Sequence, residues 1–343
     1  MSIDLFVRYK GVVMSPEELC EEYLRISALR PRTELSYRNV VAVFAKDTHV
    51  KDIKSVTNDL VIGWRDKILN RASETTWHTY QRTLRALWNY ALEEGYLDHN
   101  PFKKVRSPRA VKKEPKLLPV RTIQRAIRYL DQCEGTDRHK PAWFWRTVFK
   151  TLFYTGMRAQ QLVNLRWEDI DFEERMITLG YRGSKTRREW RLPIPDEIYD
   201  DLRELEEKTL SYAMKTPAEL KGDQVFRVQL FNSEYARYEM HADQIFGFFR
   251  RLSQDLGEKI SAHRLRHTMA TLLAAEGKVN LKILQYILGH TDVRTTMEYL
   301  HPDPTTLREA LGTLSLETTA GKKSIERLSV AAEKVDKGEP EGE

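Results

Sequence analysis

The sequence predicts a mainly α-helical protein with one small antiparallel β-sheet (α+β), divided into two domains. Apolar residues recur at helical spacing through most of the chain, whereas they alternate in two short segments near residues 177–181 and 190–194. A basic stretch with three prolines, residues 101–116, separates two regions whose charges balance. A chain of 343 residues is also long enough to build two separate cores.

Residues 15–100 have the pattern of a four-helix domain, preceded by an N-terminal extension of residues 1–14. Ser15, Pro16 and Glu18 give the first helix an N-cap serine, a proline in the first turn and a capping-box glutamate. The fourth helix is expected to end at Gly95. The apolar positions that define the four helices are Leu19, Tyr23 and Ile26; Tyr37, Val40, Val41 and Phe44; Leu60, Trp64 and Ile68; and Tyr80, Leu84, Leu87 and Ala91.

The stretch from residue 101 to residue 116 carries the whole net charge of +6, because it holds 7 basic residues and 1 acidic residue. Its prolines and its scarcity of large apolar residues predict an extended interdomain linker. Fully extended, it would reach about 50 Å and could meet several DNA phosphates. A solvated hinge is the alternative that charge alone leaves open. The candidate DNA-binding residues are Lys103, Lys104, Arg106, Arg109, Lys112 and Lys113.

Residues 117–314 are predicted to form the second domain, which holds the β-sheet. A strongly apolar helix around Trp145 stops at Gly156, and another helix starts directly after it. The two alternating segments predict a β-hairpin with Lys185 in its turn. Residues 197–255 have a helical pattern with a loop near Pro217 and Gly222.

The C-terminal tail, residues 315–343, is polar except for one narrow apolar stripe. The spacing of Ile325, Leu328, Ala332 and Val335 predicts one apolar face on a short helix. Because so short a helix is marginal on its own in water, we expect it to dock on another surface if it forms. A frayed, disordered terminus is the alternative.

Composition excludes several classes of protein. A hydrophobic fraction of 41% is too high for a disordered chain. No apolar run approaches the length of a membrane helix, and the N-terminus has no signal-peptide core, so we expect a cytoplasmic protein. Cys20 and Cys133 lie far apart without metal-ligand spacing and are expected to be buried thiols.

Five short motifs occur in a fixed order between residues 155 and 299. Each motif alone is weakly specific, but the ordered set resembles the tyrosine recombinase (phage integrase) family. Residues 15–101 more weakly resemble the four-helix, SAM-like core-binding domain of that family. The motifs are Thr155-Gly156-Met157-Arg158, the hairpin residue Lys185, His263-Arg264-Leu265-Arg266-His267, Leu288-Gly289-His290, and Thr295-Thr296-Met297-Glu298-Tyr299.

The resemblance implies cleavage of a DNA phosphodiester without a cofactor or metal ion. It makes Tyr299 the nucleophile, His263 the group that accepts its proton, and Lys185 the acid that protonates the departing 5′ oxygen. The expected product is a 3′-phosphotyrosyl bond and a free 5′-hydroxyl. Such a transition state needs fixed positive donors, which Arg158 and Arg266 supply as planar guanidinium groups, with His290 as a third donor.

Two further residues are expected to support this site. Many family members carry an acidic residue at the position of Gln161, and we interpret the amide as a neutral acceptor that helps to orient a guanidinium. His267 is expected to support the site or to cap a helix. His263 and His267 at i, i+4 could suggest zinc, but no credible third ligand accompanies them, so no metal site is expected.

The interval from His290 to Tyr299 must bend. One unbroken helix would separate the two residues by about 13 Å along its axis, too far for both to meet one phosphate. The sequence does not say whether Tyr299 then acts in its own site or in that of a neighbouring protomer.

The resemblance implies a site-specific recombinase that exchanges strands through a Holliday junction. The expected partners are double-stranded DNA with a specific recombination site, three further copies in a homo-tetramer on two sites, and possible accessory DNA-bending proteins, with no membrane partner. The tail would dock on a neighbouring protomer, and the enzyme would act at a bacterial or phage nucleoid. Only about fourteen residues precede the first helix, so no separate arm-binding domain is expected.

Two alternative functions stay open at this point. A type IB topoisomerase uses a similar set of residues to relax DNA, although the core-binding domain favours recombination. A catalytically silent DNA-binding regulator could also use the same fold, although the complete set of catalytic residues argues against it. The target sequence, the direction of the reaction and the host element are not encoded in the motifs.

Overall fold

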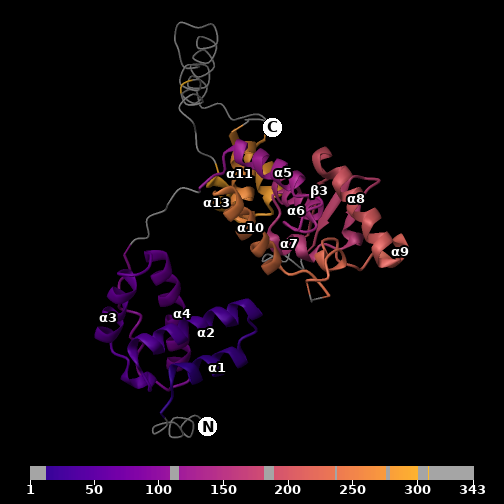
Figure 1. The fold of residues 1–343 in the computed structure, drawn as a ribbon. Helices are drawn as coiled ribbons and strands as arrows, with labels where there is room; N and C mark the ends of the chain where they lie inside the picture. The colour runs from indigo at the N-terminus through magenta and orange to yellow at the C-terminus, as the bar shows by residue number, and fades with distance from the viewer. Residues whose placement is uncertain are drawn as a thin grey trace, which may run out of the picture. The chain divides into compact units, whose positions relative to one another are not determined.

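The computed structural model describes residues 13–108, 116–180, 189–235, 238–275, 279–299 and residue 308. The chain separates into two compact units, Met1–Glu114 and Pro115–Glu343, which are described separately (Figure 1). Unit 1 is helical, and unit 2 combines helices with a small sheet, as the sequence predicts.

Unit 1 contains the four expected helices. The capping box forms as predicted, since the Ser15 side chain accepts from the Glu18 amide at 3.2 Å and Glu18 accepts from the Ser15 amide at 2.7 Å. Aromatic rings fill the core, where Phe44 meets Trp64 edge-on at 5.0 Å. The elements are α1 (Pro16–Ile26), α2 (Pro31–Thr48), the 3-10 turn η1 (Ile53–Ser55), α3 (Asn58–Leu69) and α4 (Glu74–Glu93).

Residues 101–108 differ from the expectation of an extended linker. Phe102 is fully buried, with its ring 5.0 Å from that of Trp88, and Val105 is buried beside the same core. The Gln81 amide donates to the carbonyls of Phe102 and Val105 at 3.3 and 2.6 Å. Burial of an aromatic ring stabilises by about 2 kcal/mol or more, which outweighs the preference of the flanking lysines for solvent. This part of the basic stretch is therefore fixed on α4.

The basic residues of that stretch are divided by this packing. Lys103, Lys104 and Arg106 are exposed on the surface of unit 1. Arg109, Lys112 and Lys113 lie outside the described residues. The described half of the stretch therefore presents its charges from a fixed backbone.

The sheet of unit 2 confirms the predicted hairpin and adds a third strand. β2 (Met176–Leu179) pairs antiparallel with β3 (Trp190–Pro193), with Ile177 opposite Leu192 and Leu179 opposite Trp190. β1 (Ile170–Asp171) pairs with the other edge of β2, and its two residues are too few to give a periodic signal. Residues 181–188, with Lys185, lie outside the described residues.

The helices of unit 2 surround α6, whose aromatic face lies at the centre of the core. The rings of Trp145 on α6 and Phe248 on α10 stack at 4.7 Å, and α6 also packs on α5, α8 and α11. The elements are α5 (Val120–Gln132), α6 (Ala142–Thr155), α7 (Ala159–Asn164), η2 (Trp167–Asp169), α8 (Asp196–Ala213), α9 (Pro217–Leu220), η4 (Val228–Leu230), α10 (Ala242–Leu256), α11 (Ala262–Ala275), α12 (Leu281–Leu288) and α13 (Val293–Met297).

The segment between α9 and α10 differs from the helical pattern expected for residues 197–255. Most of this segment is not helical. It buries apolar residues such as Val225 and Phe226, and its backbone bonds to distant segments, as when the Val225 N–H donates to the Leu165 carbonyl at 3.0 Å. The buried Gln224 amide donates to the carbonyls of Val163 and Met240 and accepts from the Met240 amide. The Gln224 side chain thus gives hydrogen-bond partners to buried backbone N–H and C=O groups that have none within a helix.

The two cysteines lie in the interior of their units. Cys20 and Cys133 are buried free thiols, as predicted. Within the described residues, no helix combines the length and apolar character that a bilayer crossing requires.

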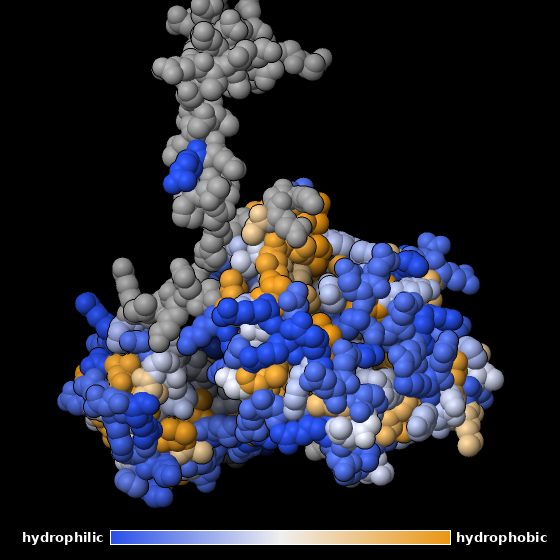
Figure 2. Space-filling view, turned by 45° about the horizontal axis from the view of Figure 1, so that its top comes forward, coloured by the Kyte–Doolittle hydropathy of each residue, from blue (hydrophilic) through white to orange (hydrophobic). Residues whose placement is uncertain are grey.

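Figure 2 shows apolar side chains gathered at the end of unit 2 formed by α11 to α13. The predicted tail helix lies outside the described residues.

Candidate active site

The described motif residues converge at one place in unit 2. The ring of Tyr299 lies 5.1 Å from that of His267 and 6.2 Å from that of His290, which it faces at an angle of 15°. Lys185 lies outside the described residues. The converging residues are Arg158 at the start of α7, His263, Arg266 and His267 on α11, His290 after α12, and Tyr299 after α13.

The bend expected between His290 and Tyr299 is present. α12 ends at Leu288, and Gly289 adopts a left-handed φ of 58°, which reverses the chain before the short helix α13. The reversal brings Tyr299 against the cluster of Met269, Leu284 and Leu288, where it is buried. Tyr299 is thereby held next to His290 of its own chain.

Arg266 is buried where three segments meet. Its guanidinium donates to the carbonyls of Gly156 at 2.5 Å and Leu288 at 2.6 Å, and to Nε2 of His290 at 3.0 Å. The two carbonyls lie at the C-terminal ends of α6 and α12, where the helix dipoles place partial negative charge. Two helix ends therefore stabilise this buried cation without a carboxylate partner among the described residues.

The electrostatics of Arg266 follow from this position. Burial, together with the nearby Arg158, lowers the pKa of Arg266 to about 10. The group therefore stays protonated at neutral pH. A planar cation fixed by carbonyls is already oriented when a phosphate arrives, so little reorganisation is needed in the transition state.

The bonds of His290 define its tautomer. Because Arg266 can only donate, Nε2 of His290 must accept, and Nδ1 must carry the proton that it donates to the Thr296 hydroxyl at 3.0 Å. Burial, with Arg266 and Arg158 nearby, lowers the pKa of His290 to about 4. His290 is thus neutral and accepts at Nε2 in this structure, and its expected role as a donor to phosphate stays a prediction.

His263 and His267 share one proton. Their Nε2 atoms lie 2.7 Å apart, so one of them must donate to the other. Nδ1 of His267 is buried without a partner among the described residues. An unpaired lone pair costs less than an unpaired N–H, which indicates that His267 donates from Nε2 and that His263 accepts.

Tyr299 is a neutral phenol in this environment. Burial raises the pKa of Tyr299, and the guanidinium groups of Arg266 and Arg158 counteract part of that increase. The phenol must therefore lose its proton as it attacks. His267, expected only as a supporting residue, lies against the Tyr299 ring, and His263 contacts His267.

Gln161 supports Arg158 in a different way from the one expected. Its Oε1 accepts from the backbone N–H of Arg158 at 2.8 Å, so it fixes the first turn of α7 rather than the guanidinium. Burial lowers the pKa of Arg158, and the nearby Tyr299 opposes that effect. Among the described residues, the Arg158 guanidinium makes no hydrogen bond or ion pair. It therefore keeps its donors for an anionic ligand.

The two low-pKa histidines predict a loss of stability in acid. The pKa of His267 is lowered to about 4, by burial and by His263, and that of His290 is equally low, whereas both titrate near 6.5 when unperturbed. Between these values the unfolded chain binds more protons, so the free energy of unfolding of unit 2 falls as the pH drops from about 6.5 towards 4. Denaturant unfolding at several pH values measures this, and a double variant, His267→Gln with His290→Gln, should have a shallower pH dependence. If the double variant had an equally steep pH dependence, the low pKa values of His267 and His290 would not be the cause of the acid sensitivity.

No metal-binding cluster of three or more His, Cys, Asp or Glu side chains occurs among the described residues. His263 and His267 contact each other, and His267 also contacts Tyr299. The positive charge of this site comes from the guanidinium groups of Arg158 and Arg266.

A second candidate surface lies on α4 in unit 1, where no motif of the sequence indicated functional residues. Polar residues spaced by three and four positions line a hollow of about 790 Å³, and no acidic residue is among them. Arg82, Arg85 and Asn89 are exposed there, and the Ser107 hydroxyl accepts from Trp77 at its edge. We call this surface the α4 face; it is lined by Thr75, His78, Thr79, Gln81, Arg82, Arg85, Ala86, Asn89 and Ser107.

Comparisons with protein families match both units. A model described as the phage integrase family matches residues 122–306. A model described as the phage integrase SAM-like domain matches residues 17–107. The two matched ranges hold the candidate active site and the α4 face.

Similar sequences carry related names. The chain is 33% identical to a putative tyrosine recombinase XerC of Pseudomonas syringae over 308 residues, which are 87% of this chain and 64% of that protein. It is 32% identical to a putative tyrosine recombinase XerC of Pseudomonas aeruginosa, over 88% of this chain and 72% of that protein. The chain thus spans about two thirds of the length of these relatives.

Solved structures share the fold at lower identity. The Tn1549 transposon integrase in complex with a circular intermediate DNA superposes with a TM-score of 0.69 at 21% identity, over 87% of this chain and 99% of that one. A lambda integrase tetramer bound to a Holliday junction gives a TM-score of 0.65 at 14% identity, over 85% and 78%.

Proposed function

Because this chain belongs to the phage integrase family of tyrosine recombinases, we propose that it is a site-specific DNA recombinase that cleaves and rejoins duplex DNA through Tyr299. The observation that carries the proposal is the position of Tyr299 beside two arginines and two histidines of the same chain. This set of groups suits in-line attack on a phosphodiester, because the positive charge is fixed around the nucleophile.

In the proposed reaction, the Tyr299 oxygen forms a bond to the scissile phosphorus as the bond to the 5′ oxygen breaks. The phenol proton passes to Nδ1 of His267 as the Nε2 proton of His267 passes to Nε2 of His263, so that His263 is the final acceptor, and Lys185 protonates the 5′ oxygen that leaves. The products are a 3′-phosphotyrosyl bond and a 5′-hydroxyl. Attack by a 5′-hydroxyl reverses the steps, and in a recombinase that hydroxyl comes from the partner duplex, which gives a Holliday junction.

Two arginines would hold the non-bridging oxygens of the phosphate. Arg158 offers donors that no described residue occupies, and Arg266 offers a guanidinium that carbonyls already orient. An incoming phosphate would compete with Nε2 of His290 for Arg266. His290 would then need a proton at Nε2 to act as a donor, which a change of tautomer at the site can supply.

The α4 face and the exposed basic residues beside it are proposed to bind DNA. Arg82 and Arg85 project from one stripe of α4, and Lys103, Lys104 and Arg106 are exposed on the segment packed against the same helix. A surface with basic and amide groups and without carboxylates fits a polyanion. Arg109, Lys112 and Lys113 are proposed to extend this contact along the chain.

We expect the double variant Arg82→Ala with Arg85→Ala to weaken DNA binding. If both residues contact phosphates, the slope of log K against log salt should flatten by up to about 0.9 per contact, equally for all sequences. Binding titrations across a salt series measure the slope. The double variant Lys51→Ala with Lys54→Ala removes the same charge from exposed positions elsewhere on unit 1 and should keep the slope. Equal slopes for the two variants would contradict a role for the α4 face.

Strand exchange would require four copies on two DNA sites. The lambda integrase structure named above is a tetramer on a Holliday junction, and this chain shares its fold. Large apolar side chains exposed on α11 to α13 are proposed to contact neighbouring protomers, and the C-terminal tail is proposed to dock on one of them. These side chains are Leu272, Ile283, Val293 and Met297.

Trapping a covalent adduct tests the proposed function. Wild-type protein should form an adduct resistant to SDS on a nicked suicide duplex that carries its recombination site, in the presence of EDTA. Inverted repeats near the gene supply candidate sites. Relaxation of plasmids that lack the site would favour a topoisomerase, and tight binding without any adduct would favour a silent regulator.

A further inference from the structure

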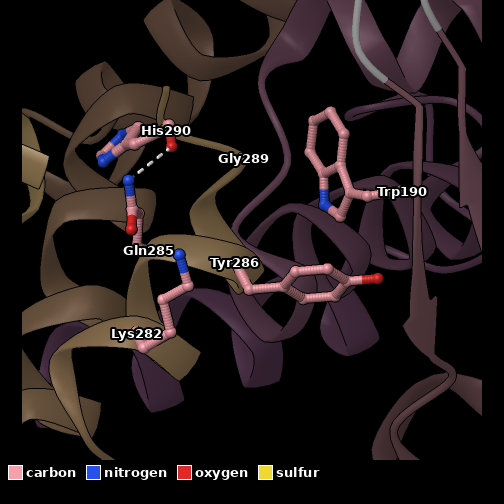
Figure 3. Close-up of a pocket in the computed structure, with 6 residues that line it drawn as sticks. All are labelled: Trp190, Lys282, Gln285, Tyr286, Gly289 and His290. Carbon is pink, nitrogen blue, oxygen red and sulfur yellow. Dashed lines mark hydrogen bonds between the residues drawn. The ribbon is translucent and has the colours of Figure 1, made fainter. Parts of the chain in front are cut away.

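We propose that Trp190, at the start of β3, is a positioning residue for His290, and that it acts by holding the left-handed corner at Gly289. The proposal rests on the proposed function, because it assigns Trp190 to the same site. The indole and the histidine come from parts of unit 2 that are a hundred residues apart in sequence, and they line one small cavity with Gly289 between them (Figure 3).

The contact between Trp190 and Gly289 is closer than any side chain would permit. A Cβ atom added at Gly289 would lie 2.3, 2.4 and 2.9 Å from three atoms of the indole ring. Real Cβ atoms do not approach other heavy atoms so closely, so the ring occupies the space that a side chain would take. The φ of 58° makes the same position costly for any other residue. Gly289 is therefore required both by its backbone conformation and by the ring.

The corner is held from its other side by Gln285. The backbone N–H of His290 donates to the Gln285 carbonyl at 3.1 Å, and the Gln285 amide donates back to the His290 carbonyl at 3.1 Å, which Figure 3 marks. The Gly289 N–H also donates to the Tyr286 carbonyl at 2.9 Å, so backbone hydrogen bonds tie the corner to α12, whereas its opposite side is packed by a ring. The three heavy atoms nearest to such a Cβ atom all belong to the Trp190 indole, so the ring closes this side of the corner.

Trp190 is itself held by the sheet. It pairs with Leu179 of β2 and is buried in the main core of unit 2. Its indole N–H has no hydrogen-bond partner among the described residues. The ring rather than the N–H therefore makes the contact, and a phenyl ring could replace part of it.

The consequence concerns the imidazole of His290. Its ring bonds both Arg266 and Thr296, so a shift of the backbone corner moves three groups of the site together. Catalytic groups tolerate displacements of only about half an ångström. Trp190 therefore stabilises the productive position of His290 and couples the sheet to the site.

A double-mutant cycle on cleavage tests this inference. Trp190→Ala should lower the single-turnover rate of adduct formation by about 10²-fold, as expected for a misplaced catalytic group. In a His290→Ala background, the same change should lower the rate less than about threefold, because the group that it positions is gone. Trp190→Phe should have a rate between those of wild type and Trp190→Ala, because a phenyl ring lacks the outer indole atoms that lie nearest to Gly289. Rates are measured at saturating protein, at a temperature where every variant is folded by circular dichroism.

A buried tryptophan elsewhere in unit 2 provides the control. Trp167 is as buried as Trp190 and also has an unpartnered indole N–H, but it does not line the cavity beside His290. If Trp167→Ala lowers the rate of adduct formation, its fold-reduction should be the same in the wild-type and His290→Ala backgrounds. Equal effects of Trp190→Ala in both backgrounds, or a wild-type rate for Trp190→Ala, would overturn the inference. Absence of an adduct with wild-type protein would instead overturn the proposed function.

Discussion

Tyr299→Phe should abolish the covalent adduct on a nicked suicide duplex while DNA affinity stays within about twofold of wild type. The change removes one oxygen atom, and that oxygen is the proposed nucleophile, so the rate should fall by at least about 10³-fold. The ring remains in place against His267 and His290, and the fold should therefore be preserved. SDS gels of the trapped complex measure the adduct, and mobility shifts measure binding.

Tyr286→Phe is the matched control for the nucleophile. Tyr286 is a second tyrosine near the site, on α12, but it is about half exposed and lines the cavity beside Gly289. Loss of its hydroxyl should leave adduct formation unchanged. An adduct formed by Tyr299→Phe, or one lost in Tyr286→Phe alone, would show that the nucleophile has been assigned wrongly.

Features determined by neighbours in sequence were predictable from the residues alone. Ser15 and Glu18 form the predicted capping box because both partners lie within one helical turn. Gly156 ends α6 where the apolar pattern stops. The alternating segments around Ile177 and Leu192 form the two paired strands that the pattern indicated. In each case the signal and the structure share the same few residues.

Features determined by tertiary contacts were not predictable in the same way. Phe102 lies within a basic, proline-containing stretch, and nothing nearby in sequence indicates the ring of Trp88 that buries it. The resemblance grouped Arg266 and His290, but not the bond in which His290 accepts, because that bond depends on the exact ends of α6 and α12. The close approach of Trp190 to Gly289 has no sequence signal beyond the glycine itself.

The α4 face was predictable in part, because it combines a local sequence pattern with a tertiary contact. Its residues recur at helical spacing in the sequence, so the stripe could have been seen. A polar stripe, however, is also what any solvated helix face presents. Only the packing of residues 101–108 against the same helix, with their exposed lysines, distinguishes it from such a face.

Arg266→Lys should damage both the stability of unit 2 and catalysis. A lysine ammonium cannot reproduce the planar set of bonds to Gly156, Leu288 and His290, so at least one buried carbonyl at a helix end would lose its partner. Each such loss costs about 1–3 kcal/mol of unfolding free energy. Loss of the oriented guanidinium should also lower adduct formation by about 10²- to 10³-fold. Denaturant unfolding and single-turnover trapping measure the two effects.

Arg158→Lys separates the two roles, because the Arg158 guanidinium makes no hydrogen bond or ion pair with a described residue. Its replacement should lower adduct formation by a similar factor of about 10²-fold or more while changing the unfolding free energy by less than about 1 kcal/mol. The contrast follows from the structure: one arginine is held by two helix ends before DNA arrives, and the other waits for the phosphate. Equal losses of stability in the two variants would refute the view that the ends of α6 and α12 hold Arg266 in place.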